Sequence, residues 1–600
     1  MSIRHTYLWR CMSAVGSRRI ELGLSFGVAV LAVAVLAIAP GLSATGLRPI
    51  LQPSPINITN DDSMRYGEPE IAVNPRNPNN MVYYVMSNQL TYACEAAGNP
   101  NCAIDPLSGA PVGEFTTPGW ISTHIYVTSN GGKSWQDVTA NLNAIPAPSV
   151  VTDQTGTHTI THTDLISRGD PMVTAAANGT FYIGWDAMNL GTIYLPPGYT
   201  FGGHVICPIT TPPPGCPVHG LLDGGIAVSK STDGGVHWST PQLTGTGVDR
   251  PWMTSDPWTG TVYEASSGTI NSAMSTGDPL LPPASPAPPD RYVVWSTDGV
   301  NWSSPVGLGG GGFSGAGGST ISAARGVLAA AFQSTSAAGC QYFLSAAATA
   351  PCAVFETWTP SGWSRHAVPG LASATGSILV AAHPFLPGTY TVAATDPTTT
   401  EYHVYVTHDG GSTWSGPTVV TDGSNFCPGV TVAACKFKPW IDYSPLGVLA
   451  LGWRSANVSP GSYAKRNPAD ASSASKSRHE PLCDYRGCGL STDGDEDANA
   501  AGAITVPYTM WAAVSIDAGA TFTQPLQVSQ GASSPSDPLM LGGTDDTSFI
   551  GASYFNVVVG WGQWPNGTSS AGLPFNVQGQ FANISIPAFF IQTPASQTRH

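Results

Sequence analysis

Charged side chains are scarce in this chain, and many of them stand directly before short apolar stretches. Asp, Glu, Lys and Arg make up 10% of the 600 residues, against a usual share of about 25%. The polar residues that head these stretches are Arg65, Tyr66, Glu68, Arg168, Asp170, Asp249, Arg250, Lys438, Asp545 and Asp546. Guanidinium groups bind carboxylates through paired hydrogen bonds, and positioned carboxyl groups transfer protons. The pattern indicates one polar site assembled from several separate segments.

The apolar stretches behind these residues form a repeat. Each begins with a polar residue or Pro and runs through an apolar strand, a turn and a second strand that often carries an aromatic residue. The seven copies begin near Glu68, Asp170, Arg250, Thr320, Ile378, Lys438 and Phe549. Near-continuous apolar sequence is typical of strands that are covered on both faces. We predict that each copy forms the two inner strands of one sheet.

A second motif lies between these stretches and occurs five times. The copies are Thr128–Trp135, Ser231–Trp238, Thr407–Trp414, Ser515–Phe522 and the one-residue-shorter Ser296–Trp302. Their third positions are Asn130, Asp233, Asp409, Asp517 and Asp298. Such a side chain accepts hydrogen bonds from amides of its own turn, the following Gly permits positive φ, and the closing aromatic packs against the hairpin. We predict that these five residues are structural rather than ligands.

The five motifs resemble the Asp-box, or BNR repeat, of the sialidase-like superfamily, and the repeat pattern covers most of the mature chain. The resemblance implies an all-β fold, a β-propeller of four-stranded antiparallel blades. Seven inner-strand pairs favour seven blades, with six, the number in sialidases, as the alternative. We expect Leu47–Asn60 to supply a strand that closes the ring, and loop insertions near 136–168, 204–222, 275–290 and 455–504.

The same resemblance implies an activity. In sialidases three arginines bind the carboxylate of the sugar, a tyrosine assisted by a glutamate attacks the anomeric carbon, and an aspartic acid acts as general acid and base. The catalytic candidates here are Arg65, Glu68, Arg168, Asp170, Asp249 and Arg250. Arg65, Arg168 and Arg250 would form the clamp, and Asp170 or Asp249 would be the acid. No tyrosine is assigned as nucleophile, although Tyr443 and Tyr554 lie in inner stretches.

The chain departs from the sialidase pattern in its first blade. Met64–Pro69 stands nearest to the Phe-Arg-Ile-Pro motif of that family and matches only its arginine and proline. The fold therefore does not carry the activity. A structural alternative is that Asp170-Pro171 and Asp249-Arg250-Pro251 are strand-entry turns whose carboxylates cap local backbone and pair with neighbouring arginines.

Further residues at the heads of the stretches are candidates for substrate binding: Tyr66, Trp252, Lys438, Trp440 and Asp545. Trp252 and Trp440 follow a proline and could stack on sugar rings, or could fill the core between blades.

These observations predict a secreted glycan-active protein, an exo-sialidase-like glycoside hydrolase acting on terminal sugars of glycoconjugates or polysaccharides. One alternative is a non-catalytic surface propeller that binds carbohydrate or protein. Another is a hydrolase of neutral polysaccharide that uses two carboxylates about 5 to 9 Å apart. Whether the protein is an enzyme is left open, with glycoside hydrolase as the favoured class.

Residues 1–44 predict an export signal, and residues 45–600 a single propeller. Arg18-Arg19 precede an apolar run, Leu22–Ala39, and small residues follow at Ser43-Ala44. An uncleaved N-terminal anchor is the alternative and the only expected link to a membrane. We expect an extracellular or cell-surface monomer.

Ten of the eleven cysteines fall into close pairs, which predicts local disulfides in an exported chain. The pairs are Cys94/Cys102, Cys207/Cys216, Cys340/Cys352, Cys427/Cys435 and Cys483/Cys488.

The formal net charge of −15 disfavours nucleic acid as a partner and favours carbohydrate. No cofactor is expected to be required. Asp493, Asp495 and Asp497 could hold a structural Ca²⁺, although this segment lacks the final Glu of an EF-hand loop.

Overall fold

A computed structural model gives the fold of the chain. It describes residues 55–59, 65–88, 103–104, 111–113, 121–146, 149–153, 156–160, 167–195, 200–201, 204–205, 216–246, 251–267, 291–309, 320–372, 375–396, 401–421, 436–455, 483–484, 487–488, 509–529, 549–563 and 578–589. The export signal expected at residues 1–44 lies outside this set. Within it, no helix is long and apolar enough to cross a membrane.

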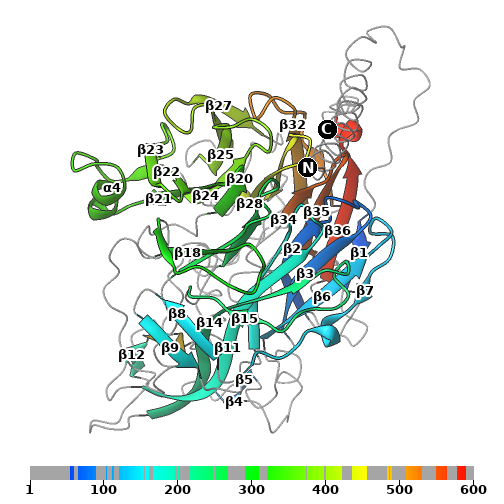
Figure 1. Ribbon diagram of the computed structural model, residues 1–600, viewed down its shortest axis with the longest axis vertical. Coiled ribbons are helices and arrows are strands. Elements are labelled where there is room, and N and C mark those ends of the chain that lie inside the picture. The colour runs from blue at the N-terminus through cyan, green and yellow to red at the C-terminus, as the bar shows by residue number, and fades with distance from the viewer. Residues whose placement is uncertain are drawn as a thin grey trace, which may run out of the picture. The chain divides into compact units, whose positions relative to one another are not determined.

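Seven four-stranded antiparallel sheets follow one another along the chain (Figure 1). Blade 1 contains β2 (Arg65–Val73), β3 (Met81–Asn88), β6 (Ile121–Thr128) and β7 (Gln136–Asp137). Blade 2 contains β10 (Ser167–Ala175), β11 (Phe181–Leu195), β14 (Cys216–Ser231) and β15 (Gln242–Leu243). Blade 3 contains β16 (Trp252–Ser255), β17 (Val262–Ser267), β18 (Arg291–Ser296) and β19 (Val306–Leu308). Blade 4 contains β20 (Thr320–Ala324), β21 (Val327–Ser334), β22 (Cys352–Thr359) and β23 (Gly362–Ala367).

The remaining blades repeat this order. Blade 5 contains β24 (Thr375–Ala382), β25 (Tyr390–Thr395), β26 (Tyr402–Thr407) and β27 (Ser415–Val420). Blade 6 contains β28 (Lys436–Tyr443), β29 (Leu449–Ser455), β32 (Thr509–Ser515) and β33 (Leu526–Gln527). Blade 7 contains β34 (Phe549–Ala552), β35 (Asn556–Gln563), β36 (Gln578–Ser585) and, from the other end of the chain, β1 (Ile56–Asn57). The seven-bladed propeller is confirmed, and the six-bladed alternative is wrong.

The ring is closed by strands from opposite ends of the sequence. Ile56 of β1 pairs with Phe581 of β36, and Asn57 pairs with Gln580. In Figure 1 the blue β1 lies beside the red β36. The closing strand falls within the segment predicted for this role, Leu47–Asn60. Closure leaves no blade without a neighbour, which removes the exposed sheet faces that an open array would have.

Smaller elements lie between the blade strands. They are the hairpins β4 (Ala103–Ile104) with β5 (Pro111–Gly113), β8 (Ser149–Asp153) with β9 (Gly156–Ile160), β12 (Thr200–Phe201) with β13 (His204–Val205) and β30 (Cys483–Asp484) with β31 (Gly487–Cys488), and the short helices η1 (Thr139–Asn141), α4 (Ala337–Phe343) and η2 (Ile586–Phe589).

One of the five predicted disulfides is present in the part of the chain that the structure describes. It joins Cys340 of α4 to Cys352 of β22. The backbones of Cys483 and Cys488 pair in register across the hairpin of β30 and β31, but their side chains are outside the described set. The side chains of the other three predicted pairs are also outside it, so these bonds stay predictions: Cys94 with Cys102, Cys207 with Cys216, and Cys427 with Cys435.

Every junction between neighbouring blades has its own hydrophobic core. Between blades 1 and 2, for example, Tyr84 packs with Phe181 and Trp185, all almost fully buried. Corresponding clusters fill the other six junctions. Both faces of each sheet are therefore buried, which explains why the inner strands are apolar at nearly every position.

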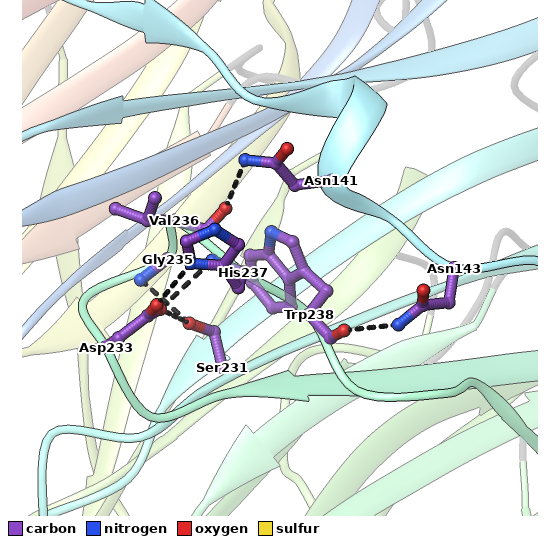
Figure 2. A network of polar contacts seen from close by, with 8 residues as sticks. All are labelled: Asn141, Asn143, Ser231, Asp233, Gly235, Val236, His237 and Trp238. Carbon is purple, nitrogen blue, oxygen red and sulfur yellow. Dashed lines mark hydrogen bonds and ion pairs between the residues drawn. The ribbon is translucent and has the colours of Figure 1, made fainter.

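The five repeated motifs form the turns between the third and fourth strands. In blade 2 (Figure 2), Gly235 N donates to Ser231 Oγ at 2.9 Å, and His237 N donates to Asp233 Oδ1 at 3.0 Å. Asn130, Asp298, Asp409 and Asp517 accept backbone amides of their own turns in the same way. Partial burial acts to raise the pKa of Asp233, but hydrogen bonds from His237 and Ser231 lower it to about 2. These five side chains are occupied by hydrogen bonds within their own turns.

Each such turn also fastens its blade to the one before. Gly235 has a φ of 96°, and a Cβ there would lie 2.6 Å from Cγ2 of Val82 in blade 1, so only Gly fits. The amide of Asn80 donates to Gly234 O at 2.8 Å. Figure 2 shows the second link, in which Asn141 and Asn143 from the segment after β7 donate to Val236 O and Trp238 O at 2.8 and 2.7 Å.

Candidate functional site

The innermost strands of several blades share a bulge near their first residue. The pairing is interrupted between Gly67 and Glu70 in β2, between Gly169 and Met172 in β10, and between Phe437 and Trp440 in β28. Each interruption contains a charged residue followed by proline: Glu68-Pro69, Asp170-Pro171 and Lys438-Pro439. Proline cannot donate to the strand ladder, so the bulge is its natural place. In blade 3 the same pattern of a charged residue followed by proline, Arg250-Pro251, stands immediately before β16.

These bulges put chemically active residues at one level of the ring. We call this the strand-start end, the end at which β2, β10, β16, β20, β24, β28 and β34 begin. Bulges redirect side chains and are common beside active sites. The five repeated turns lie at the opposite end, because the third strand of each blade runs away from the strand-start end.

Asp170 has an unusual backbone conformation. Its φ is 42°, in the left-handed region that non-Gly residues rarely adopt, and its side chain is half-buried. Asp and Asn tolerate this region better than other residues. Pro171 fixes the next φ, so the position of Asp170 is rigid. Strained residues of this kind concentrate at functional sites.

Glu70 lies beside Asp170, across the junction of blades 1 and 2. Its Oε2 accepts the backbone N–H of Val173 in β10 at 2.7 Å, and the side chain is buried. Burial raises the pKa of Glu70 to about 8; the Val173 hydrogen bond opposes this shift and the negative charge of Asp170 adds to it. Glu70 is therefore protonated at neutral pH.

Most of the other predicted site residues are placed by their backbone only. Arg65 pairs with Asn88 at the start of β2, and Arg168 pairs with Ala187 near the start of β10. Tyr66 and Glu68 lie in β2 and Lys438 in β28, all at the strand-start end. The side chains of these five residues lie outside the described set, and so do Asp249, Arg250, Asp545 and Asp546 in full.

Two predicted substrate-binding tryptophans meet across the ring. Trp252 of blade 3 and Trp440 of blade 6 have ring centroids 4.6 Å apart and an interplanar angle of 32°. Trp252 is 9% exposed and belongs to the core between blades 3 and 4, and Trp440 packs against three of the junction cores. The pair joins two innermost strands, at the first residue of β16 and at the first paired residue after the bulge of β28.

The two tyrosines noted in the inner stretches, Tyr443 and Tyr554, do not lie at the strand-start end. Tyr443 is the last residue of β28, and Tyr554 lies in the turn after β34 rather than in a strand. Both are at the end opposite the strand starts. Burial raises the pKa of Tyr443, whose hydroxyl lies 2.7 Å from Thr391 Oγ1. The sequence order alone could not show which end of an inner strand each tyrosine occupies.

Several carboxyl groups inside the blade strands were missed by the sequence analysis, among them the buried Glu356 of β22. Besides Glu70, Glu264 of β17 accepts hydrogen bonds from Thr244 and Thr246 at 3.1 and 2.5 Å, and Asp442 of β28 accepts the N–H of Ala552 at 3.3 Å. Burial raises the pKa of Glu264 and of Asp442 to about 7 in spite of these hydrogen bonds. A charged residue inside an apolar strand of a charge-poor chain was the available signal.

Blade 2 carries a projecting ribbon at the strand-start end. β11 and β14 remain paired out to Leu195 and Cys216, whereas the pairing of β10 with β11 begins only at Ser167 and Met188. The seven further residue pairs extend about 23 Å at a rise of about 3.3 Å per residue. The ribbon stands beside the strand that carries Arg168 and Asp170. The expected loop at 204–222 thus contains strand at its far end.

No metal site appears in the part of the chain that the structure describes, where no three His, Cys, Asp or Glu side chains gather suitably. Asp493, Asp495 and Asp497, the residues considered for Ca²⁺, lie outside that part.

Comparisons with known proteins identify no family for this chain. No family model matches the chain, and no curated protein matches it. A protein of unknown function from Dyadobacter fermentans is 12% identical over 90% of this chain and 100% of its own, with a TM-score of 0.37. A Hadza microbial sialidase is 12% identical over 90% and 98%, with a TM-score of 0.35. A mutant NanB sialidase of Streptococcus pneumoniae is 11% identical over 70% and 68%, also with a TM-score of 0.35. These values carry no argument about activity.

Proposed function

We propose that the protein is a secreted glycan-active protein, an exo-sialidase-like glycoside hydrolase that acts at the strand-start end on a terminal anionic sugar. The observation that carries this proposal is the shared bulge, at which Glu68, Asp170 and Lys438 occupy equivalent positions in three blades. Bulges beside active sites and strained residues such as Asp170 are typical of sites that bind and transform a polar ligand.

The chemistry of the residues at this end fits an anionic sugar. The chain has a net charge of −15 and would repel an anion unless cations gather locally. Arg65, Arg168 and Arg250 supply the guanidinium groups for a carboxylate clamp in the proposal, and Asp170 or Asp249 supplies the acid. Of these two acids the structure describes Asp170, whose φ is 42° and whose side chain is half-buried.

The test is release of the fluorophore from a 4-methylumbelliferyl sialoside by the purified chain, beside a panel of neutral fluorogenic glycosides. We expect Arg250→Ala and Asp170→Asn each to lower kcat/KM at least about 100-fold, the usual effect of losing a charge clamp or a general acid. Lys133→Ala is the matched control, since this exposed lysine lies in a turn at the opposite end. Release from neutral glycosides alone would favour a two-carboxylate hydrolase, and no release from any glycoside would overturn the proposal.

A further inference from the structure

The turns between the first and second strands of four blades, called inner turns here, are built alike. Each contains a residue with an acceptor side chain, then proline, then a third residue whose backbone N–H donates to that acceptor. The four are Asn74-Pro75-Arg76, Asp256-Pro257-Trp258, His383-Pro384-Phe385 and Ser444-Pro445-Leu446, with donor–acceptor distances of 2.9, 2.7, 3.1 and 3.2 Å. The turn does not depend on its third side chain, because Arg, Trp, Phe and Leu all occur there. These turns lie at the end opposite the strand-start end.

The third residue of the blade 3 turn is Trp258, which is held by its neighbours and yet is 52% exposed. Its Nε1 donates to Pro384 O, in the inner turn of blade 5, at 2.5 Å. The guanidinium carbon of Arg325, from the inner turn of blade 4, lies 4.3 Å from the centroid of the Trp258 ring. Arg325 in turn donates to Phe385 O at 2.8 Å. Because the N–H and one face of the indole are occupied, its opposite face is the apolar surface left open to solvent.

A buried carboxylate fixes the backbone beneath both side chains. Asp256 accepts the N–H groups of Trp258 and Arg325 at 2.7 and 3.1 Å, and also that of Gly326. Arg325 has a φ of 57°, in the left-handed region that non-Gly residues rarely adopt. Backbone strain of this kind persists only where the surrounding structure holds it, and it is common at ligand-binding sites. Since Trp258 is already fixed, little side-chain freedom is lost when a ligand binds to it.

The connection between neighbouring blades does not require the tryptophan. At the junction of blades 1 and 2, Arg76 Nε donates to Ala177 O of the next inner turn at 3.0 Å. Arg325 makes the same kind of link to Phe385 O of the next blade. An arginine thus links two inner turns by itself, and the exposed indole of Trp258 is an addition to that link.

We propose that Trp258 and Arg325 form a second, non-catalytic carbohydrate-binding site that takes a uronic acid residue within a polysaccharide chain. The apolar face of the sugar ring stacks on the open face of Trp258, and the sugar carboxylate pairs with Arg325. The site goes beyond the proposed function, because it lies at the opposite end of the propeller and takes no part in bond cleavage.

The free charge of Arg325 selects an acidic sugar. Arginine carries five N–H donors, and the Arg325 side chain makes one hydrogen bond and no ion pair with the described residues. Arg365 differs: it lies 5.7 Å from the ring centroid of Tyr342, but its charge is paired with Glu356 at 2.9 Å. A cationic ligand would be repelled by Arg325. The exposed indole contacts a ring from one face only, which suits an internal sugar of a long chain.

The test is isothermal titration calorimetry of the purified chain with trigalacturonic acid and with a hyaluronan tetrasaccharide, which carries glucuronic acid, each beside its methyl ester. We expect at least one acid to bind, and Trp258→Ala to weaken that binding at least about tenfold. Trp258→Phe keeps a ring and should lose less. Arg325→Gln should weaken the acid at least about fivefold and leave the ester unchanged. Tyr342→Ala is the matched control, since this ring is 49% exposed beside a paired arginine, and it should bind as the wild type does.

Urea unfolding of each variant checks that it is folded. No binding of either acid by the wild type, or binding unchanged in either Trp258→Ala or Arg325→Gln, would overturn the site. Equal affinity for an acid and its ester would overturn the choice of an acidic sugar. Because the titration measures no turnover, an inactive wild type would refute the proposed function and leave this result intact.

Discussion

The junction of blades 1 and 2 and the junction of blades 4 and 5 make the same hydrogen bond with different chemistry. Glu70 accepts the N–H of Val173 at 2.7 Å, and Thr320 accepts the N–H of Val380 at 2.8 Å. Both amides belong to buried innermost strands. The geometry shows that the propeller requires an acceptor at this position and does not require a charge.

A second pair of junctions repeats this contrast two residues further along. Ser322 accepts the N–H of Ala382 at 2.9 Å between blades 4 and 5, whereas Asp442 accepts the N–H of Ala552 at 3.3 Å between blades 6 and 7. The junction of blades 4 and 5 thus uses hydroxyls at both positions. Where a carboxyl replaces a hydroxyl, the stability of the junction comes to depend on pH, because the carboxyl can ionise and the hydroxyl cannot.

The largest expected effect is that pH dependence. The folded-state pKa of Glu70, about 8, lies above its ordinary value of 4.5, so the folded protein binds more protons than the unfolded chain between these two values. Stability should therefore fall as pH rises from about 4.5 to about 8 and level off above, by on the order of a few kcal/mol. Urea unfolding at half-unit pH steps measures the slope.

The variant Glu70→Gln tests whether Glu70 causes this slope of stability against pH. We expect the slope of stability against pH between pH 6 and 8 to become shallower in the variant. The residual slope should come from groups such as Glu264, Asp442 and Glu356, because burial raises the pKa of all three, to about 7 for the first two. An identical slope in the variant and the wild type would show that Glu70 titrates normally in the folded protein.

Thr320→Val tests the junction that uses hydroxyls. The substitution keeps the shape of the side chain but leaves the buried N–H of Val380 without its acceptor, which costs about 1 to 3 kcal/mol. Because no ionisable group is involved, the loss should be equal at pH 5 and pH 8. Thr320→Ser is the control that keeps the hydroxyl and should lose much less. A loss that changed with pH would contradict the contrast between the two junctions.

The fold was accessible from the sequence because its signals are local and repeated. Seven apolar stretches and five turn motifs each lie within a few dozen residues, and the turn residues act on their own backbone. Four of the charged residues at the strand starts directly precede a proline, which marked them in the sequence: Glu68, Asp170, Arg250 and Lys438. Glu70 was missed because its partner, Val173, is 103 residues away in the next blade. The register of one blade against another cannot be obtained from the spacing within either.

The smallest expected effect on stability is in the repeated turns, where blades 1 and 2 already carry Asn and Asp at the same position. Asn130 in blade 1 and Asp233 in blade 2 occupy the same position, and each accepts an amide of its own turn at 3.0 Å. Asp233 differs by also accepting His237 Nδ1 at 2.7 Å, a contact that is exposed to solvent and therefore screened. We expect Asp233→Asn to lower stability at pH 7 by less than about 1 kcal/mol.

Because hydrogen bonds lower the pKa of Asp233 to about 2, its contribution to stability is present above pH 3.8 and lost as pH falls toward 2. The sign is opposite to that of Glu70, so the wild type should lose more stability than the variant on acidification from pH 4 to pH 2. Equal losses in the two proteins, measured by urea unfolding, would mean that the carboxylate adds nothing to what an amide at this position supplies.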